Sequence, residues 1–227
     1  KLKTESLLVH GGQEPDSVTG SIAVPIHQTT TYKFKNTKYA ADLFALKEFG
    51  NIYVRLQNPT TEVFEKRMAL LEGATAALAT ASGMSAISLS ILNIAQYADE
   101  IIASDSLYGG TRTLFANTFK KFGIKVHFIK ISDLDGIKKL INNKTKAIYA
   151  ETLGNPKLDI ADIESLSDIA HKNKIPLIVD NTLTPYILKP IQYGADIVVY
   201  SATKFLCGHG TSLGGVIIDS GKFDWDN

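Results

Sequence analysis

The chain has 227 residues, of which 44% are hydrophobic, so it can bury a sizeable core in one or two domains and intrinsic disorder is excluded. Its 24 Lys and Arg residues nearly balance its 23 Asp and Glu residues. Because no overall basic charge exists to attract nucleic acid or an anionic membrane, we expect a small-molecule partner.

Cysteine content and the start of the chain indicate the compartment. Cys207 is the single cysteine, so no internal disulfide can form, and residues 1–16 lack the apolar core of a signal peptide. The apolar runs end well before the ~18 residues that a membrane span needs. We therefore expect a cytoplasmic protein without membrane contact.

Residues 1–60 are rich in Thr, Gln, Asn and Tyr and show little periodicity, which predicts an extended N-terminal arm. A helix is expected to begin at Pro59, with Asn58 as its N-cap, and to end at Gly73. Residues 61–227 are expected to form the second domain, which carries the ligand site.

From residue 76 onward, short apolar runs alternate with helical stretches. The runs lack the alternation of a half-solvated strand, so we interpret them as strands buried on both faces, in a parallel sheet that helices cover. The predicted fold class is α/β, with a mostly parallel seven-stranded sheet. The predicted strands are 76–80, 100–104, 125–130, 146–150, 176–180, 196–200 and 214–219.

The last predicted strand is followed only by the short segment GKFDWDN, which has neither a closing element nor a linker composition. We therefore expect that a C-terminal domain is absent from this chain.

Polar residues follow the carboxyl ends of five predicted strands, where open α/β sheets bind their ligands. In chain order they are Ser82, Gly83 and Met84; Asp105, Tyr108, Gly109 and Gly110; Glu151 and Asn155; Asp180, Asn181 and Thr182; Ser201, Thr203 and Lys204.

Each of these groups has a functional and a purely structural interpretation. Ser82 could help to hold a phosphate at a helix N-terminus, or it could be an ordinary N-cap. Asp180 could bind a ligand, or it could cap the following segment. Lys204 could act as a nucleophilic amine, or it could be a solvated surface lysine. Together, a carboxylate, an amine and several hydroxyls suit pyridoxal phosphate, which needs a partner for its ring nitrogen, a lysine and phosphate donors.

Over essentially its whole length the sequence resembles the pyridoxal-phosphate enzymes of cysteine and methionine metabolism, which have the type I aminotransferase fold. Within that family, residues 43–51 and the closing GKFDW resemble the O-acetylhomoserine sulfhydrylase branch. The motifs that carry the resemblance are Tyr53-x-Arg55-x-x-Asn58-Pro59-Thr60, Ser82-Gly83-Met84, Tyr108-Gly109-Gly110-Thr111, Asn155-Pro156, Val179-Asp180-Asn181-Thr182 and Ser201-Ala202-Thr203-Lys204.

The resemblance implies a role for each matching residue. Lys204 would be the Schiff-base lysine and proton carrier, Asp180 would pair with the pyridine nitrogen, and Tyr108 would stack on the ring. Asn155 would reach the phenolic oxygen. Tyr53 and Arg55 would bind the phosphate of a neighbouring subunit, which makes a dimer the smallest complete site. The remaining cofactor-binding residues would be Ser82, Gly83, Met84, Thr182, Ser201 and Thr203.

The implied activity is that of a transferase of methionine biosynthesis, which makes homocysteine or methionine from O-acetyl-L-homoserine and sulfide or a small thiol. The expected assembly is a homo-oligomer, with a dimer as the site unit and a tetramer as the whole. Alternatives are a cystathionine γ-synthase or γ-lyase, a catalytically idle cofactor-binding fragment or assembly subunit, and a sugar- or nucleotide-binding module. No metal site is expected, because the five histidines show no ligand spacing.

Overall fold

The computed structural model describes residues 3–226. They form two compact units that divide between Leu70 and Leu71. We call the part up to Leu70 the N-terminal unit and the part from Leu71 the sheet unit, and each is described by itself.

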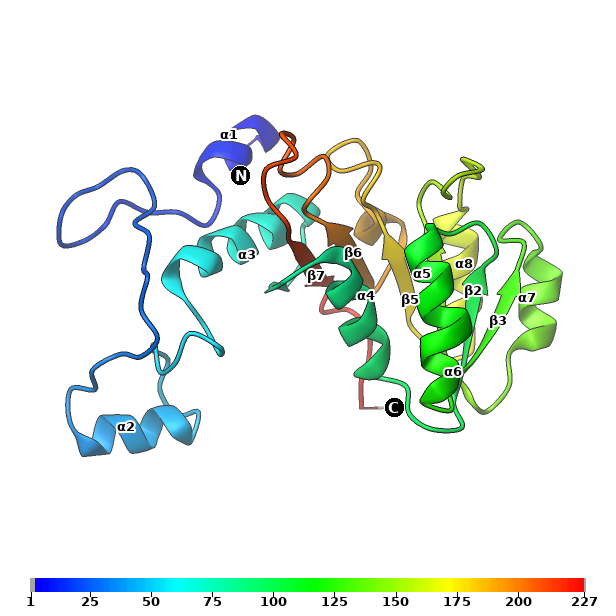
Figure 1. Ribbon diagram of the computed structural model, residues 1–227, viewed down its shortest axis with the longest axis horizontal. Coiled ribbons are helices and arrows are strands. Elements are labelled where there is room, and N and C mark those ends of the chain that lie inside the picture. Colours follow the sequence, from blue (N-terminus) through cyan, green and yellow to red (C-terminus); the bar gives the residue numbers. More distant parts are fainter. Residues whose placement is uncertain (1–2, 227) are drawn as a thin grey trace. The chain divides into compact units, whose positions relative to one another are not determined.

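The N-terminal unit contains α1 (Thr4–His10), α2 (Thr37–Phe44) and most of α3 (Pro59–Glu72). Long stretches without regular structure separate these helices (Figure 1). The expectation of an arm that is extended throughout is therefore wrong for α1 and α2. In α2 the Asn36 side chain accepts a hydrogen bond from the Tyr39 N–H at 2.8 Å, which supplies an N-cap. Helices of seven and eight residues are too short for an apolar repeat to stand out.

α3 begins as predicted, with the Asn58 side chain accepting a hydrogen bond from the Thr60 N–H at 2.9 Å. The division between the two units nevertheless lies later than the expected boundary after residue 60. Arg67 explains the difference, because its guanidinium donates to the Gly11 carbonyl at 2.9 Å and to the Gln13 side chain at 2.8 Å. Most of α3 is thereby tied to the start of the chain.

The sheet unit contains one seven-stranded sheet with the strand order β1-β7-β6-β5-β4-β2-β3. The five strands from β3 to β6 in this order are parallel, whereas β7 runs antiparallel to both β6 and β1. All seven predicted strands are confirmed, as is the mostly parallel sheet. The strands are β1 (Ala76–Thr80), β2 (Glu100–Ser104), β3 (Lys125–Ile129), β4 (Thr145–Glu151), β5 (Leu177–Asp180), β6 (Ile197–Ser201) and β7 (Gly215–Asp219).

Helices cover both faces of this sheet (Figure 1). One face packs against α4 (Gly83–Leu92), α5 (Gly109–Thr113) and α6 (Phe119–Lys121), with a π-helical turn at Leu114–Thr118 between the last two. The other face packs against α7 (Leu134–Leu140) and α8 (Ile163–Lys172), and a 3-10 turn (Pro190–Tyr193) precedes β6.

The core explains why the central strands are apolar on both faces. Tyr149 of β4 is fully buried, and its ring lies edge-on to Phe115 with 5.0 Å between the ring centroids. On the opposite face, Leu166 and Ala170 of α8 are also fully buried. Because both faces of β4 and β5 are covered, polar side chains are tolerated only at the strand ends.

None of the helices in residues 3–226 combines the length and the apolar character that crossing a membrane requires.

Candidate active site

A cavity of about 910 Å³ lies in the sheet unit, at the carboxyl ends of β4, β5 and β6. It brings together all the predicted site residues of this unit. They are Ser82, Gly83, Met84, Tyr108, Asn155, Asp180, Thr182, Ser201, Thr203 and Lys204. Parallel strands end at the same edge of a sheet, which is why residues far apart in the sequence meet here.

Ser82 opens α4 and is its N-cap, because its Oγ accepts a hydrogen bond from the Ser85 N–H at 3.1 Å. The structural interpretation of Ser82 is therefore confirmed. The next backbone N–H groups have no partner within the helix. They give its N-terminus a partial positive charge at the cavity. Ser201 faces the same cavity, and no residue in 3–226 occupies its hydroxyl with a hydrogen bond. The N-terminus of α4 and the Ser201 hydroxyl together suit an anion the size of a phosphate.

Gly83 allows the close approach of α4 to the end of β6. A Cβ at position 83 would lie 2.6 Å from Ser201 Cβ and 2.8 Å from Ser201 Cα. The backbone at the helix start is thus in contact with the strand end, and a side chain would force the two apart.

We expect Gly83→Ala to lower the free energy of unfolding by about 1–3 kcal/mol, the usual cost of overpacking. Urea denaturation measures the effect. The control is Gly109→Ala, since a Cβ at position 109 meets nothing within 4 Å. Equal midpoints for the two variants would contradict the close approach.

Two threonine hydroxyls hold the loops that shape the cavity. Thr182 Oγ1 accepts a hydrogen bond from the Ser201 N–H at 2.8 Å, and its side chain also interacts with the Asp180 carboxylate. Thr203 Oγ1 instead donates to the Gly214 carbonyl at 3.2 Å and accepts from the Gly214 N–H at 3.1 Å. The Thr203 hydroxyl is thus occupied by a structural contact, and the Thr182 hydroxyl lies between Ser201 and Asp180.

Asp180 ends β5 at the wall of the cavity. Its Oδ1 accepts a hydrogen bond from the Thr182 N–H at 2.9 Å, which confirms the capping interpretation. Its Oδ2 accepts a longer hydrogen bond, of 3.4 Å, from the Tyr149 hydroxyl. Burial raises the pKa of Asp180 above its ordinary value, while the hydrogen bonds from Thr182 and Tyr149 lower it. A cationic donor at this carboxylate would be stabilised.

Tyr108 and Lys204 are both exposed side chains of the cavity. Tyr108 is the residue before α5, and 51% of its surface is exposed. Lys204 lies in the tight turn after β6, where its carbonyl accepts a hydrogen bond from the Gly208 N–H at 2.8 Å. An aromatic face and a primary amine are thus both accessible to a molecule in the cavity.

One carboxyl group that the sequence places at the ligand edge, Glu151, was given no role in the site there. Glu151 ends β4 and lines the cavity, and only 7% of its surface is exposed. Its position directly after a buried strand was the available signal. The sequence also gave no indication of the other lining residues, which are Ile87, Leu153, Leu183, Phe205, Gly208, Gly210 and Leu213.

Tyr53 and Arg55 are not among the residues that line this cavity. Both belong to the N-terminal unit, where the Arg55 guanidinium lies over the Tyr53 ring at 5.6 Å from its centroid. Tyr53 also forms an isolated bridge with Thr31. This cation–π interaction holds the Arg55 side chain in a defined position.

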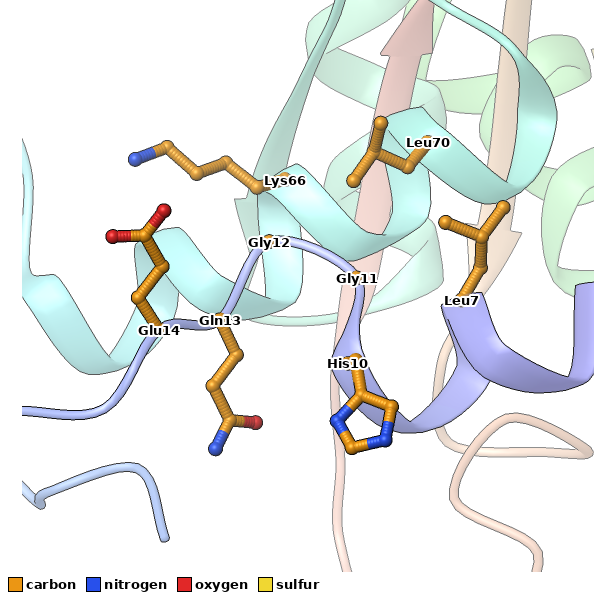
Figure 2. A pocket seen from close by; sticks show the side chains of 8 residues that line it. All are labelled: Leu7, His10, Gly11, Gly12, Gln13, Glu14, Lys66 and Leu70. Atoms are coloured by element: carbon orange, nitrogen blue, oxygen red, sulfur yellow. The ribbon is translucent and has the colours of Figure 1, made fainter. Parts of the chain in front are cut away.

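A second cavity, of about 630 Å³, lies within the N-terminal unit between α1 and α3 (Figure 2). Leu7 and Leu70 contribute its apolar side chains, and Lys66 and Glu14 contribute its charges. Lys66 already pairs with Glu62 one turn earlier in α3. No residue that the sequence analysis singled out for chemistry lines this cavity, so the candidate site is the one in the sheet unit.

Comparisons with known proteins identify the family of this chain. Residues 5–227 match the family described as Cys/Met metabolism PLP-dependent enzyme. The chain is 60% identical to an O-acetyl-L-homoserine sulfhydrylase from Leptospira meyeri, over 99% of this chain and 51% of the relative. It is 48% identical to a homocysteine synthase from Schizosaccharomyces pombe, over 97% of this chain and 52% of the relative. The chain thus spans about half the length of these relatives.

Two solved structures are also similar. A Campylobacter jejuni protein assigned as O-acetylhomoserine (thiol)-lyase, which carries a pyridoxyl-lysine monophosphate, has a TM-score of 0.95 at 44% identity, covering 98% of this chain and 55% of that one. A cystathionine γ-lyase from Lactobacillus plantarum, complexed with L-serine, has a TM-score of 0.89 at 34% identity, covering 96% of this chain and 55% of that one. These likenesses confirm the type I fold that the sequence implied.

Proposed function

We propose, given that the chain belongs to the Cys/Met metabolism PLP-dependent enzyme family, that it acts as an O-acetylhomoserine sulfhydrylase. The 60% identity to the Leptospira meyeri sulfhydrylase over nearly the whole chain is the observation that carries this proposal. The substrates would be O-acetyl-L-homoserine and sulfide or a small thiol, and the products homocysteine or methionine and acetate. Such a transferase would serve methionine biosynthesis in the cytoplasm.

The cavity of the sheet unit fits pyridoxal phosphate. Asp180 offers a carboxylate acceptor to a protonated ring nitrogen, and the close approach of Gly83 to Ser201 forms a cradle for the phosphate. Lys204 offers the amine that holds the aldehyde carbon. When bound, this cofactor withdraws electrons from the α-carbon of an amino-acid substrate.

The other residues of the cavity would orient the cofactor. The Tyr108 ring would cover one face of the pyridine ring, and the Asn155 amide would donate to the phenolic oxygen. The phosphate would be bound by the backbone of Ser82, Gly83 and Met84 and by the hydroxyls of Thr182, Ser201 and Thr203. For Thr203 this requires the hydroxyl to give up its bond to the Gly214 carbonyl.

Lys204 Nζ would move the protons of the reaction. It would remove the α-proton of the substrate and return protons to the substrate carbons. Overall, the bond from Cγ to acetate breaks with its electron pair and a bond from Cγ to hydrosulfide forms, so atoms and charge balance. Asp180, kept anionic by a cationic partner, would stabilise positive charge on the ring.

The test of the proposed activity is a competition between nucleophiles. The complete polypeptide, loaded with pyridoxal phosphate, is supplied with O-acetyl-L-homoserine together with sulfide and cysteine at equal concentrations. Homocysteine is the expected product. Cystathionine as the main product would contradict the proposal and point to a cystathionine γ-synthase.

We also propose that Tyr53 and Arg55 bind the phosphate in the cavity of a neighbouring subunit. A dimer would then be the smallest active unit, and two such dimers would form a tetramer. Arg55 has no carboxylate partner among the ion pairs of the described residues. A guanidinium suits bidentate binding of a phosphate.

Mixing two inactive variants tests this arrangement. When Arg55→Ala and Lys204→Ala subunits are unfolded and refolded together, half of the dimers are hybrids with one intact site, so about a quarter of the wild-type activity should return. The activity of the mixture is compared with that of each variant refolded alone. If Arg55 acts within its own subunit, every hybrid site carries one defect and no activity returns.

A further inference from the structure

We propose that Glu151 is a positioning residue that fixes the backbone of Tyr108 and of Asn155, which both line the cavity. Its carboxyl group joins the start of α5 to the loop after β4. The inference rests on the proposed function, because its purpose is to hold the two groups that would contact the cofactor ring.

The geometry of Glu151 carries this inference. Its Oε1 accepts a hydrogen bond from the Tyr108 N–H at 2.7 Å, and its Oε2 accepts one from the Asn155 N–H at 3.1 Å. One buried side chain thus binds the backbone of two residues that are 43 and 4 positions away. Both oxygens are used, so a rotation of the carboxyl group would release one of the two segments.

Tyr108 depends on this contact because little else holds it. No side chain caps the N-terminus of α5, and half of the Tyr108 surface is exposed. The Tyr108 ring lies against Gly110, where a Cβ would come within 2.5 Å of Tyr108 Cε1. The ring position therefore follows from the backbone position of Tyr108, which Glu151 sets.

The protonation state of Glu151 explains how this carboxyl group can lie beside Asp180. The two residues are paired in the register of β4 and β5. Burial, together with the negative charge of Asp180, raises the pKa of Glu151 to about 8, against the hydrogen bonds from Tyr108 and Asn155. Tyr149 faces the same carboxyls from β4, and Lys204 is the cation of the cavity. Glu151 is thus mainly neutral at pH 7, which leaves the negative charge to Asp180.

This charge state makes Glu151→Gln the decisive variant. At pH 7 glutamine has the same size and net charge as the neutral acid, but it offers only one acceptor oxygen, so one of the two N–H groups faces an amide N–H instead. Losing such a contact costs about 1.5–3 kcal/mol, a factor of about 10–100. Glu164→Gln, on the exposed surface of α8, is the matched control.

We expect Glu151→Gln to bind pyridoxal phosphate about 10- to 100-fold more weakly than wild type in titrations of the apoprotein. The absorption band of the bound cofactor should also shift its pH midpoint, because Tyr108 and Asn155 would lie against the ring differently. Far-UV circular dichroism and urea denaturation show whether the variant is folded. In a Tyr108→Ala/Asn155→Ala background, Glu151→Gln should have little further effect on affinity.

Wild-type affinity and spectrum in folded Glu151→Gln would overturn the inference, and so would an undiminished effect in the double-alanine background. Failure of the proposed function looks different, because wild-type protein would then neither bind pyridoxal phosphate nor retain a borohydride-reduced label on Lys204. Glu151→Ala, which removes both acceptors, should have a larger effect than glutamine. An effect of alanine no larger than that of glutamine would also contradict the proposed contacts.

Discussion

Lys204→Ala is expected to reduce turnover by at least about 10³-fold, because it removes both the covalent anchor of the cofactor and the group that moves protons. The absorption band of the lysine-bound cofactor should disappear, and reduction with borohydride should leave no pyridoxyl label on the protein. Pyridoxal phosphate should still bind, more weakly, through Asp180 and the start of α4. Spectra and peptide mapping after reduction measure these effects.

Lys172→Ala is the control for this experiment. Lys172 lies at the exposed end of α8 and does not line the cavity. This variant should keep the activity, the absorption band and the label on Lys204. Turnover that survives Lys204→Ala, or a label on another lysine in the wild-type protein, would contradict the assignment.

The sheet could be predicted because burial on both faces leaves a direct trace in the sequence. The residues 176–180 and 196–200 read as uninterrupted apolar runs, and they form β5 and β6 at the centre of the sheet. Polar residues appear only where these strands end, so Asp180 and Ser201 marked the ligand edge. The topology of parallel strands then brought them into one cavity.

Other features depend on contacts between distant parts of the chain, which leave no local pattern. Glu151 is an acid after a strand like many others, and its role appears only when the Tyr108 and Asn155 N–H groups meet it. The expected boundary after residue 60 was early because Arg67 binds the chain around Gly11. The occupied Thr203 hydroxyl likewise depends on a partner eleven residues away.

Glu72, a buried carboxyl group that does not line the cavity, gives the second large effect. Glu72 ends α3 and is only 3% exposed, and its Oε1 accepts a hydrogen bond from the Tyr200 hydroxyl. That hydroxyl accepts one from the Asn181 side chain at 2.7 Å, next to Asp180. Glu72 Oε2 has no hydrogen-bond partner in residues 3–226. Burial raises the pKa of Glu72 from 4.5 to about 7, although Tyr200 and Lys189 act in the opposite direction.

This raised pKa makes the stability of the sheet unit depend on pH. Between pH 4.5 and 7 the folded state keeps a proton on Glu72 that the unfolded state has lost, so the free energy of unfolding falls as the pH rises through this window. Above pH 7 both states are ionised and the loss is complete. A shift from 4.5 to about 7 corresponds to about 3 kcal/mol.

Glu72→Gln should remove this dependence, because glutamine has no proton to lose. The stability of wild type minus that of Glu72→Gln should fall by about 2–3 kcal/mol between pH 5 and pH 8. Urea unfolding can be followed by the fluorescence of Trp225, the single tryptophan, whose ring lies 4.7 Å from that of Phe223 in the sheet unit. Because the two free energies of unfolding are subtracted, the contributions of all other titrating groups cancel.

Glu48→Gln makes the same chemical change at an exposed position and should give a difference that stays constant with pH. A constant difference for Glu72→Gln as well would show that Glu72 is ionised in the folded protein at pH 5. In that case its charge would be stabilised by the Tyr200 and Asn181 hydroxyl and amide groups more strongly than burial penalises it. The pH dependence of this one difference thus decides whether Glu72, which is linked to Asn181 through the Tyr200 hydroxyl, is neutral in the folded protein.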